Sequence, residues 1–252
     1  MSGNRHPLPA AWRPRLPWLV ALGLALIPLI CTAVGSAIGQ VLDLPNAAAM
    51  LVIAAAVTVS ATIGLLIARA AAPGLRGFGF RAPASQPLPA LLIIPALTVI
   101  ITVAAGGGFA PLPTIAAAVV LCAVVAVNEE LFFRGLVLGA LSRYGARVAV
   151  SGSAGFFAVL HLGSLAGGAS PLYAALQLVF AALFGIVAGE LACLTGSLWP
   201  TIAWHFAYDL ASYATGDALT PLSLTGIGVN CAALAILAVI LWRRLPRRTV
   251  DA

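Results

Sequence analysis

The chain has 252 residues, of which 62% are hydrophobic and only 8% are charged, and its mean hydropathy is +1.09. Soluble domains carry about 25% charged residues, so this composition excludes a water-soluble globule and indicates an integral membrane protein. All 13 basic residues are arginine, and the formal net charge is +6. The arginines lie in short segments between apolar runs, which is typical of topology signals, and no nucleic-acid partner is expected.

Eight segments are long and apolar enough to cross a bilayer as helices, which takes about 20 mostly apolar residues. In chain order they cover residues 17–38, 47–68, 88–105, 113–141, 148–165, 171–191, 197–214 and 222–242. Joints rich in glycine and proline separate them, such as "DLPN" after the first segment and "GGGFAPLP" after the third. The sequence therefore predicts an all-α polytopic membrane protein of about eight transmembrane helices. Residues 1–252 are expected to form a single transmembrane helical domain.

The arginines fall on alternate sides of this predicted arrangement. Twelve of the 13 lie in the N-terminal tail, in the loops after the second and fourth spans, or in the C-terminal tail. The loops after the first, third, fifth and seventh spans carry none. Because loops rich in Lys and Arg stay in the cytoplasm, the pattern predicts that both termini are cytoplasmic. The expected location is the inner (plasma) membrane of the cell, as a multi-pass protein.

The thirteenth arginine, Arg134, lies inside the fourth span together with Glu129 and Glu130, in the run "EELFFR". Each charged residue at the centre of a transmembrane helix costs about 2.5–3.5 kcal/mol, so these groups must face protein or water and find partners. Glu130 and Arg134 are four residues apart, share a helix face and can form a pair. Glu129 is turned by roughly 100° from Glu130 and is predicted to face a neighbouring helix.

Few other polar groups lie inside the predicted spans. His161 lies in "FFAVLHLG" in the fifth span, and His205 and Asp209 lie four residues apart in "WHFAYD" in the seventh. At a rise of about 1.5 Å per residue, Glu129 and His161 each lie roughly 21 Å along their helices from the nearest loop arginine. The two glutamates, the two histidines and the aspartate are therefore predicted to meet at one level inside the bundle.

This set of side chains suits the activation of a water molecule. Two histidines and a carboxylate are the ligand types of a catalytic zinc site, so Glu129, His161 and His205 are candidate ligands of Zn²⁺. Without a metal, a buried glutamate with histidine help could activate the water directly. Both routes lead to water attacking a carbonyl group. Asp209 could orient the His205 imidazole or donate a hydrogen bond to a developing oxyanion.

The runs "EELFFR", "FAVLH" and "HFAYD" resemble, in this order, the motifs of the CPBP family of intramembrane proteases. This family includes the CAAX prenyl endopeptidases of the Rce1 type (CAAX prenyl protease 2) and bacterial Abi-type relatives. The resemblance covers about residues 113–210, which are expected to be the core that carries the catalytic motifs. It implies an eight-helix protease core with a cavity open toward the cytoplasm.

The resemblance also implies roles for individual residues. Glu129 would be the general base with Glu130 assisting, His161 and His205 would bind water or metal, and Arg134 would hold the glutamates in place. Asp209 stands where many members have asparagine, so an oxyanion-donor role is not carried over to it. The predicted site residues are Glu129, Glu130, Arg134, His161, His205 and Asp209.

The leading functional hypothesis is a CAAX-type, metalloprotease-like hydrolase that cleaves a peptide or protein substrate within the membrane, where its other partners are the lipids. A second hypothesis is a non-enzymatic membrane scaffold, such as a bacteriocin or peptide immunity partner, that keeps the polar core as a binding site. A third is a proton-coupled transporter that uses the buried acids as a relay. The transporter hypothesis is weakened because the sequence shows no obvious inverted repeat.

Overall fold

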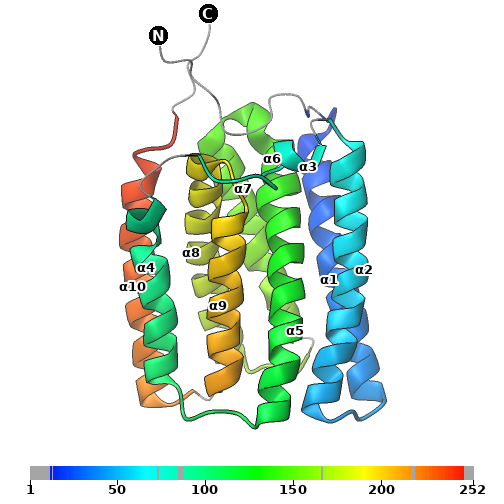
Figure 1. Cartoon of the computed structure of the whole chain (residues 1–252), viewed down its shortest axis with the longest axis vertical. Helices are drawn as coiled ribbons and strands as arrows, with labels where there is room; N and C mark the ends of the chain where they lie inside the picture. The colour runs from blue at the N-terminus through cyan, green and yellow to red at the C-terminus, as the bar shows by residue number, and fades with distance from the viewer. Residues whose placement is uncertain are drawn as a thin grey trace, which may run out of the picture.

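A computed structural model describes residues 12, 14–72, 74–84, 88–165, 167–216 and 219–246. Eight long helices run side by side as a bundle (Figure 1), and none of the described residues forms a strand. The long helices are α1 (Pro17–Val41), α2 (Asn46–Ala70), α4 (Leu88–Ala105), α5 (Leu112–Glu129), α7 (Ala146–Leu160), α8 (Pro171–Thr195), α9 (Trp199–Thr215) and α10 (Pro221–Trp242). Short helical pieces complete them: α3 (Gly74–Gly77), η1 (Glu130–Val137), α6 (Leu138–Leu141), η2 (Ser142–Tyr144) and η3 (His161–Leu165).

Seven helical segments within the described ranges are long and apolar enough to cross a membrane. They are Pro17–Val41, Asn46–Ala70, Leu88–Ala105, Leu112–Tyr144, Ala146–Leu165, Pro171–Thr195 and Pro221–Trp242. The remaining predicted span corresponds to α9, which has 17 residues and carries two of the predicted polar site residues. The all-α polytopic prediction is confirmed, and the expected number of about eight spans is close to the number observed.

The surface of the bundle is apolar, as a lipid-facing surface must be. Large side chains such as Leu19, Ile100 and Ile236 are about 60% exposed, at 62%, 61% and 60%. The interior of the bundle, by contrast, holds the segment η1, all eight residues of which are buried. The charged side chains of Glu130 and Arg134 are therefore inside the bundle, and apolar side chains cover its outside, which suits a hydrocarbon solvent.

The central segment departs from an ordinary helix at the position where its charges begin. The sequence predicts one helix over residues 113–141, and the chain is indeed helical there, but Glu130–Val137 form a π-helix between α5 and α6. π-helical turns are rare and are frequently found at functional sites. Here the change of helix type falls between Glu129, the last residue of α5, and Glu130, the first of η1.

A close approach of α7 and α8 places two aromatic rings of the site together. Gly185 in α8 makes this approach possible, since an added Cβ there would lie 3.0 Å from both the Cα and the Cβ of Ala154. The rings of Phe157 and Phe184 then lie nearly parallel, with centroids 6.1 Å apart. A larger residue at Gly185 would push the two helices apart.

The described arginines outside the spans lie at one end of the bundle, the upper end in Figure 1. This end holds the start of α1, the end of α2, α3, the turn between α6 and α7, and the end of α10. The arginines in and beside these segments are Arg15, Arg69, Arg76, Arg81, Arg143, Arg147, Arg243 and Arg244. Arg5, Arg13, Arg247 and Arg248 lie outside the described residues. The predicted side of the membrane for this end stays a prediction.

Candidate active site

Arg134 lies in the centre of the bundle, where its charge meets that of Glu130. The guanidinium Nη1 lies 3.0 Å from Glu130 Oε1, and neither side chain is exposed to solvent. The ring of Phe157 covers the guanidinium with its centroid 4.1 Å from Arg134 Cζ, and the ring of Phe184 lies 5.5 Å away. A charge in such an apolar environment needs a partner, and the ion pair with two cation–π contacts supplies it.

The imidazole of His205 joins this ion pair to the rest of the site. Its Nδ1 donates a hydrogen bond of 2.9 Å to Glu130 Oε1, the same oxygen that pairs with Arg134. This bond comes from α9 to η1, so it connects residues 75 positions apart in the sequence. With Nδ1 occupied in this way, the Nε2 atom of His205 points away from Glu130 toward the other acidic residues.

Two carboxylates face the Nε2 atom of His205. Glu129 Oε2 lies 3.7 Å from it, and Asp209 Oδ2 lies 3.3 Å from it. Asp209 is one helical turn beyond His205 in α9, whereas Glu129 comes from the end of α5. The ring of His205 therefore lies between the two neighbouring glutamates, with one nitrogen toward each.

The adjacent glutamates differ sharply in their access to water. The side chain of Glu130 is completely buried, whereas that of Glu129 is 20% exposed, and Asp209 is 26% exposed. Glu130 therefore cannot touch a substrate without a rearrangement of the core. Glu129 and Asp209 are the acidic side chains of the site that a substrate or a water molecule can reach.

His161 is positioned at the point where α7 ends and η3 begins. Its Nδ1 donates a hydrogen bond of 2.7 Å to the backbone carbonyl of Phe157 one turn earlier, which leaves Nε2 available. The ring of Phe157 contacts both histidines, with centroid distances of 4.5 Å to His161 and 6.1 Å to His205. The phenylalanine thus separates the two imidazoles and fixes the orientation of each.

Glu129, Glu130, Arg134, His205 and Asp209 are joined by direct ion pairs or hydrogen bonds. His161 reaches the same region through Phe157. The rings of Phe184 and Tyr208 also line the site, and sequence reasoning missed both, because aromatic residues at helical spacing are usual in any apolar core. Phe184 in α8 meets the ring of His205 in an edge-on contact, with the two ring centroids 5.0 Å apart.

One buried acid lies away from this group. Its place near the end of the sixth predicted span suggests that Glu190 lies at the membrane interface, and the structure buries its side chain completely. Neither carboxyl oxygen has a hydrogen-bond partner among the described residues. Its distance along α8 from the nearest loop indicated an interface, whereas the neighbouring helices cover it.

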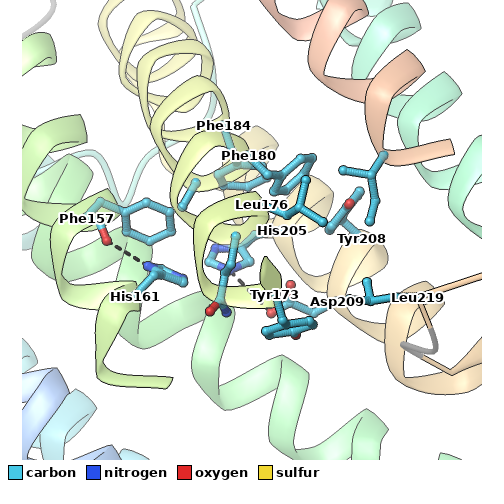
Figure 2. A pocket seen from close by; sticks show the side chains of 13 residues that line it. Phe157, His161, Tyr173, Leu176, Phe180, Phe184, His205, Tyr208, Asp209 and Leu219 are labelled. Carbon is cyan, nitrogen blue, oxygen red and sulfur yellow. Dashed lines mark hydrogen bonds and ion pairs between the residues drawn. The ribbon is translucent and has the colours of Figure 1, made fainter. Parts of the chain in front are cut away.

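A hollow of about 150 Å³ opens beside His205 and Asp209. Figure 2 shows His161, His205 and Asp209 around this space, together with aromatic side chains in its wall. The aromatic residues are Phe157, Tyr173, Phe180, Phe184 and Tyr208. The site therefore combines reactive polar groups with an apolar space next to them, as small-molecule and peptide sites usually do.

The donor types suit zinc, but their arrangement does not by itself fit an ion. Within the described ranges, no group of three His, Cys, Asp or Glu side chains is placed so that it could hold a metal. His205 Nδ1 already binds Glu130, so of this ring only Nε2, which faces the carboxylates of Asp209 and Glu129 at 3.3 and 3.7 Å, is left to bind an ion. Zinc binding by Glu129, His161 and His205 therefore stays a prediction from the sequence.

Fold and site together define a polytopic membrane protein with a cluster of acidic and basic side chains inside its helical bundle. Residues 110–211 match the profile of the family described as type II CAAX prenyl endopeptidase Rce1-like. The match runs from just before α5 into α9 and contains all the predicted site residues. Over these residues the chain is similar to the Rce1-like family, and the resemblance seen in the motifs is confirmed. No curated protein matches the chain as a whole or in part.

Proposed function

We propose that this protein is a CAAX-type intramembrane endopeptidase that hydrolyses a peptide bond with a water molecule activated by Glu129. The observation that supports this most strongly is the placement of two adjacent glutamates on opposite sides of the His205 ring. Glu130 is sealed in an ion pair, whereas Glu129 is 20% exposed and faces the Nε2 atom of His205, a residue that lines the hollow. An arrangement that served only stability would not need the second carboxylate.

Glu130 and Arg134 act as positioning residues in this proposal. Their buried pair fixes Glu130 Oε1, which accepts the hydrogen bond from His205 Nδ1. The imidazole is thereby held in one tautomer and one orientation, as second partners of catalytic histidines commonly ensure. Asp209 lies 3.3 Å from the opposite nitrogen and orients the ring from that side.

Glu129 is the general base. It takes a proton from a water molecule in the hollow, and the resulting hydroxide attacks the carbonyl carbon of the scissile bond. The Nε2 atom of His161, which its bond to Phe157 leaves available, accepts the second hydrogen of the water and orients it. Glu129 then passes its proton to the leaving nitrogen, so the products are a new carboxyl group and a new amine.

The substrate in this proposal is a peptide or protein segment that reaches the interior of the bundle. The protein is placed in the plasma membrane with its arginine-bearing loops in the cytoplasm, because loops with this charge pattern are retained there. The apolar surface of the bundle keeps it among the lipids. The hydrolytic groups lie inside the bundle, so cleavage takes place within the membrane.

The proposal is tested by comparing cells that produce the wild type with cells that produce the Glu129→Gln variant. Membrane and secreted fractions are analysed by mass spectrometry of protein N-termini. We expect a small set of new N-termini in wild-type cells that is absent with the variant at equal protein level. Identical sets would contradict the proposal, and a phenotype fully rescued by Glu129→Gln would favour the scaffold hypothesis. Uptake that follows a pH gradient would favour the transporter.

A further inference from the structure

The active site is closed at the arginine-bearing end of the bundle. Residues 78–84, which follow α3, lie across the turn between α8 and α9. Four hydrogen bonds tie them there: Leu198 N to Gly79 O (2.9 Å), Arg81 Nε to Gly196 O (2.6 Å), Ser197 Oγ to Arg81 O (2.6 Å) and Ala84 N to Thr195 O (2.8 Å). Below this cover, Leu198 and Arg134 are 1% exposed and Glu130 is 0% exposed.

The cover formed by residues 78–84 packs closely against the helices below it. Gly79 has a φ of +104°, which favours glycine, and an added Cβ there would lie 2.8 Å from Leu198 Cγ. The backbone oxygen of Phe78 likewise lies 3.3 Å from the position of a Cβ on Gly135 in η1. No room for a peptide chain remains between this segment and the buried pair of Glu130 and Arg134.

The opposite end of the site is open. The hollow beside His205 is lined at its outer edge by Tyr173, in the first turn of α8, and by Leu219, just before α10. The start of α8 and the start of α10 lie at the lower end of the bundle in Figure 1, and Figure 2 shows Tyr173 and Leu219 among the side chains around the space. A second hollow of about 70 Å³ shares both residues and continues toward Gly106 and Gly216 at this same end.

The segment that carries His161 is thinly packed at this end. α7 has only 15 residues and ends at Leu160, and η3 (His161–Leu165), which continues it, has no buried residue. The exposed fraction of the acidic side chains also increases away from the closed end, from 0% at Glu130 to 20% at Glu129 and 26% at Asp209. The described loops at this end contain no arginine.

Building on the proposed function, we propose that the substrate enters from the arginine-free end and places one large apolar side chain in the aromatic hollow. If the arginine-bearing end is cytoplasmic, the site opens on the other face of the membrane. The two expectations from the sequence, cytoplasmic arginine loops and a cavity open toward the cytoplasm, are therefore incompatible in this geometry. The substrate is then a membrane-bound or exported peptide segment, presented from outside the cytoplasm.

The size and chemistry of the hollow define the side chain that fits. Its volume of about 150 Å³ is close to that of an apolar cavity that holds benzene, so it accommodates one aromatic or large aliphatic side chain. Gln177 adds a polar group to the wall, and its Oε1 is buried without a hydrogen-bond partner among the described residues. That oxygen is available to accept a backbone N–H of the bound peptide.

Access can be measured without knowing the substrate. The native cysteines Cys31, Cys122, Cys193 and Cys231 are free and are first replaced by alanine. Single cysteines are then introduced as Asp209→Cys in the site, Leu219→Cys at the mouth of the hollow, and Arg143→Cys at the arginine end. Each variant is exposed to a charged, membrane-impermeant methanethiosulfonate in right-side-out and in inside-out vesicles. Monodisperse elution in detergent identifies the folded variants.

We expect the Arg143→Cys variant to react only in inside-out vesicles, and the Asp209→Cys and Leu219→Cys variants only in right-side-out vesicles. Adding Leu219→Trp to the Asp209→Cys variant should abolish its labelling, because the indole fills the mouth. Labelling of all three cysteines from one face would overturn the proposal. The experiment needs no proteolysis, so a protein that labels as expected but cleaves nothing would contradict the proposed function alone.

Discussion

The two adjacent glutamates allow stability and catalysis to be separated by single substitutions. Glu130→Leu removes the carboxylate that, among the described residues, forms the ion pair with Arg134, and leaves the buried guanidinium without this partner. Breaking a buried pair on one side costs about 3–5 kcal/mol. Glu129→Gln keeps size and hydrogen-bonding capacity at a position that is 20% exposed and 3.7 Å from His205, so its effect on stability should be small.

Activity should respond in a different way. Loss of a general base lowers the rate by about 10²–10⁴-fold, so Glu129→Gln should be nearly inactive although it is folded. Stability can be followed with a thiol-reactive dye during heating, because Cys122 and Cys193 are each 1% exposed and react only after unfolding. We expect a clearly lower unfolding temperature for Glu130→Leu and a nearly unchanged one for Glu129→Gln.

A double variant tests the cause of the instability. Replacing both members of a buried pair by apolar residues is often neutral or stabilising, so adding Arg134→Met to Glu130→Leu should restore the unfolding temperature. Activity should not return, since His205 has lost the acceptor for its Nδ1. The reasoning is refuted if Glu129→Gln destabilises the protein as much as Glu130→Leu, or if the double variant is no more stable than Glu130→Leu alone.

Two further predictions concern groups outside this pair. Glu190→Met should raise the unfolding temperature, because it removes a buried carboxyl whose missing hydrogen bonds cost about 1–3 kcal/mol. A lower unfolding temperature would mean that Glu190 has a stabilising partner. Treatment with a strong zinc chelator should leave peptide hydrolysis unchanged, because His205 and its neighbours do not form a three-ligand site. About one zinc per chain by mass spectrometry, lost on joint replacement of His161 and His205 by alanine, would contradict that mechanism.

The helical bundle could be predicted from the sequence because each membrane-spanning helix requires a long run of apolar residues. The run from 113 to 141 ends at Leu141 in the structure as it does in the prediction. The contact between Glu130 and Arg134 followed from their spacing of four residues, since neighbours on a helix face meet whatever surrounds them. The π-helical turn could not be predicted, because no residue pattern distinguishes it from an ordinary helix here.

The remaining contacts of the site depend on how separate helices pack. The hydrogen bond from His205 to Glu130 joins α9 to η1, and neither sequence segment indicates which of the two glutamates accepts a hydrogen bond from the imidazole. Distances along each helix predicted that the polar residues lie at one level in the bundle. They did not predict from which end of the bundle a substrate reaches them. The direction follows from the short α7 and from residues 78–84, which close the other end. The burial of Glu190 could not be predicted for the same reason, because distance along a helix does not reveal which neighbours cover a side chain.

The most direct test of the protease assignment uses purified protein in lipid nanodiscs and a mixed peptide library rich in aromatic residues, in water enriched in ¹⁸O. Mass spectrometry then identifies cleaved peptides and the oxygen in their new carboxyl ends. We predict wild-type cleavage beside large apolar residues, with one ¹⁸O atom from water in each new carboxyl group, and none with Glu129→Gln. Equal cleavage by the two proteins, or no cleavage by a folded wild type across the library, would contradict the assignment of Glu129 as the water-activating base of an intramembrane protease.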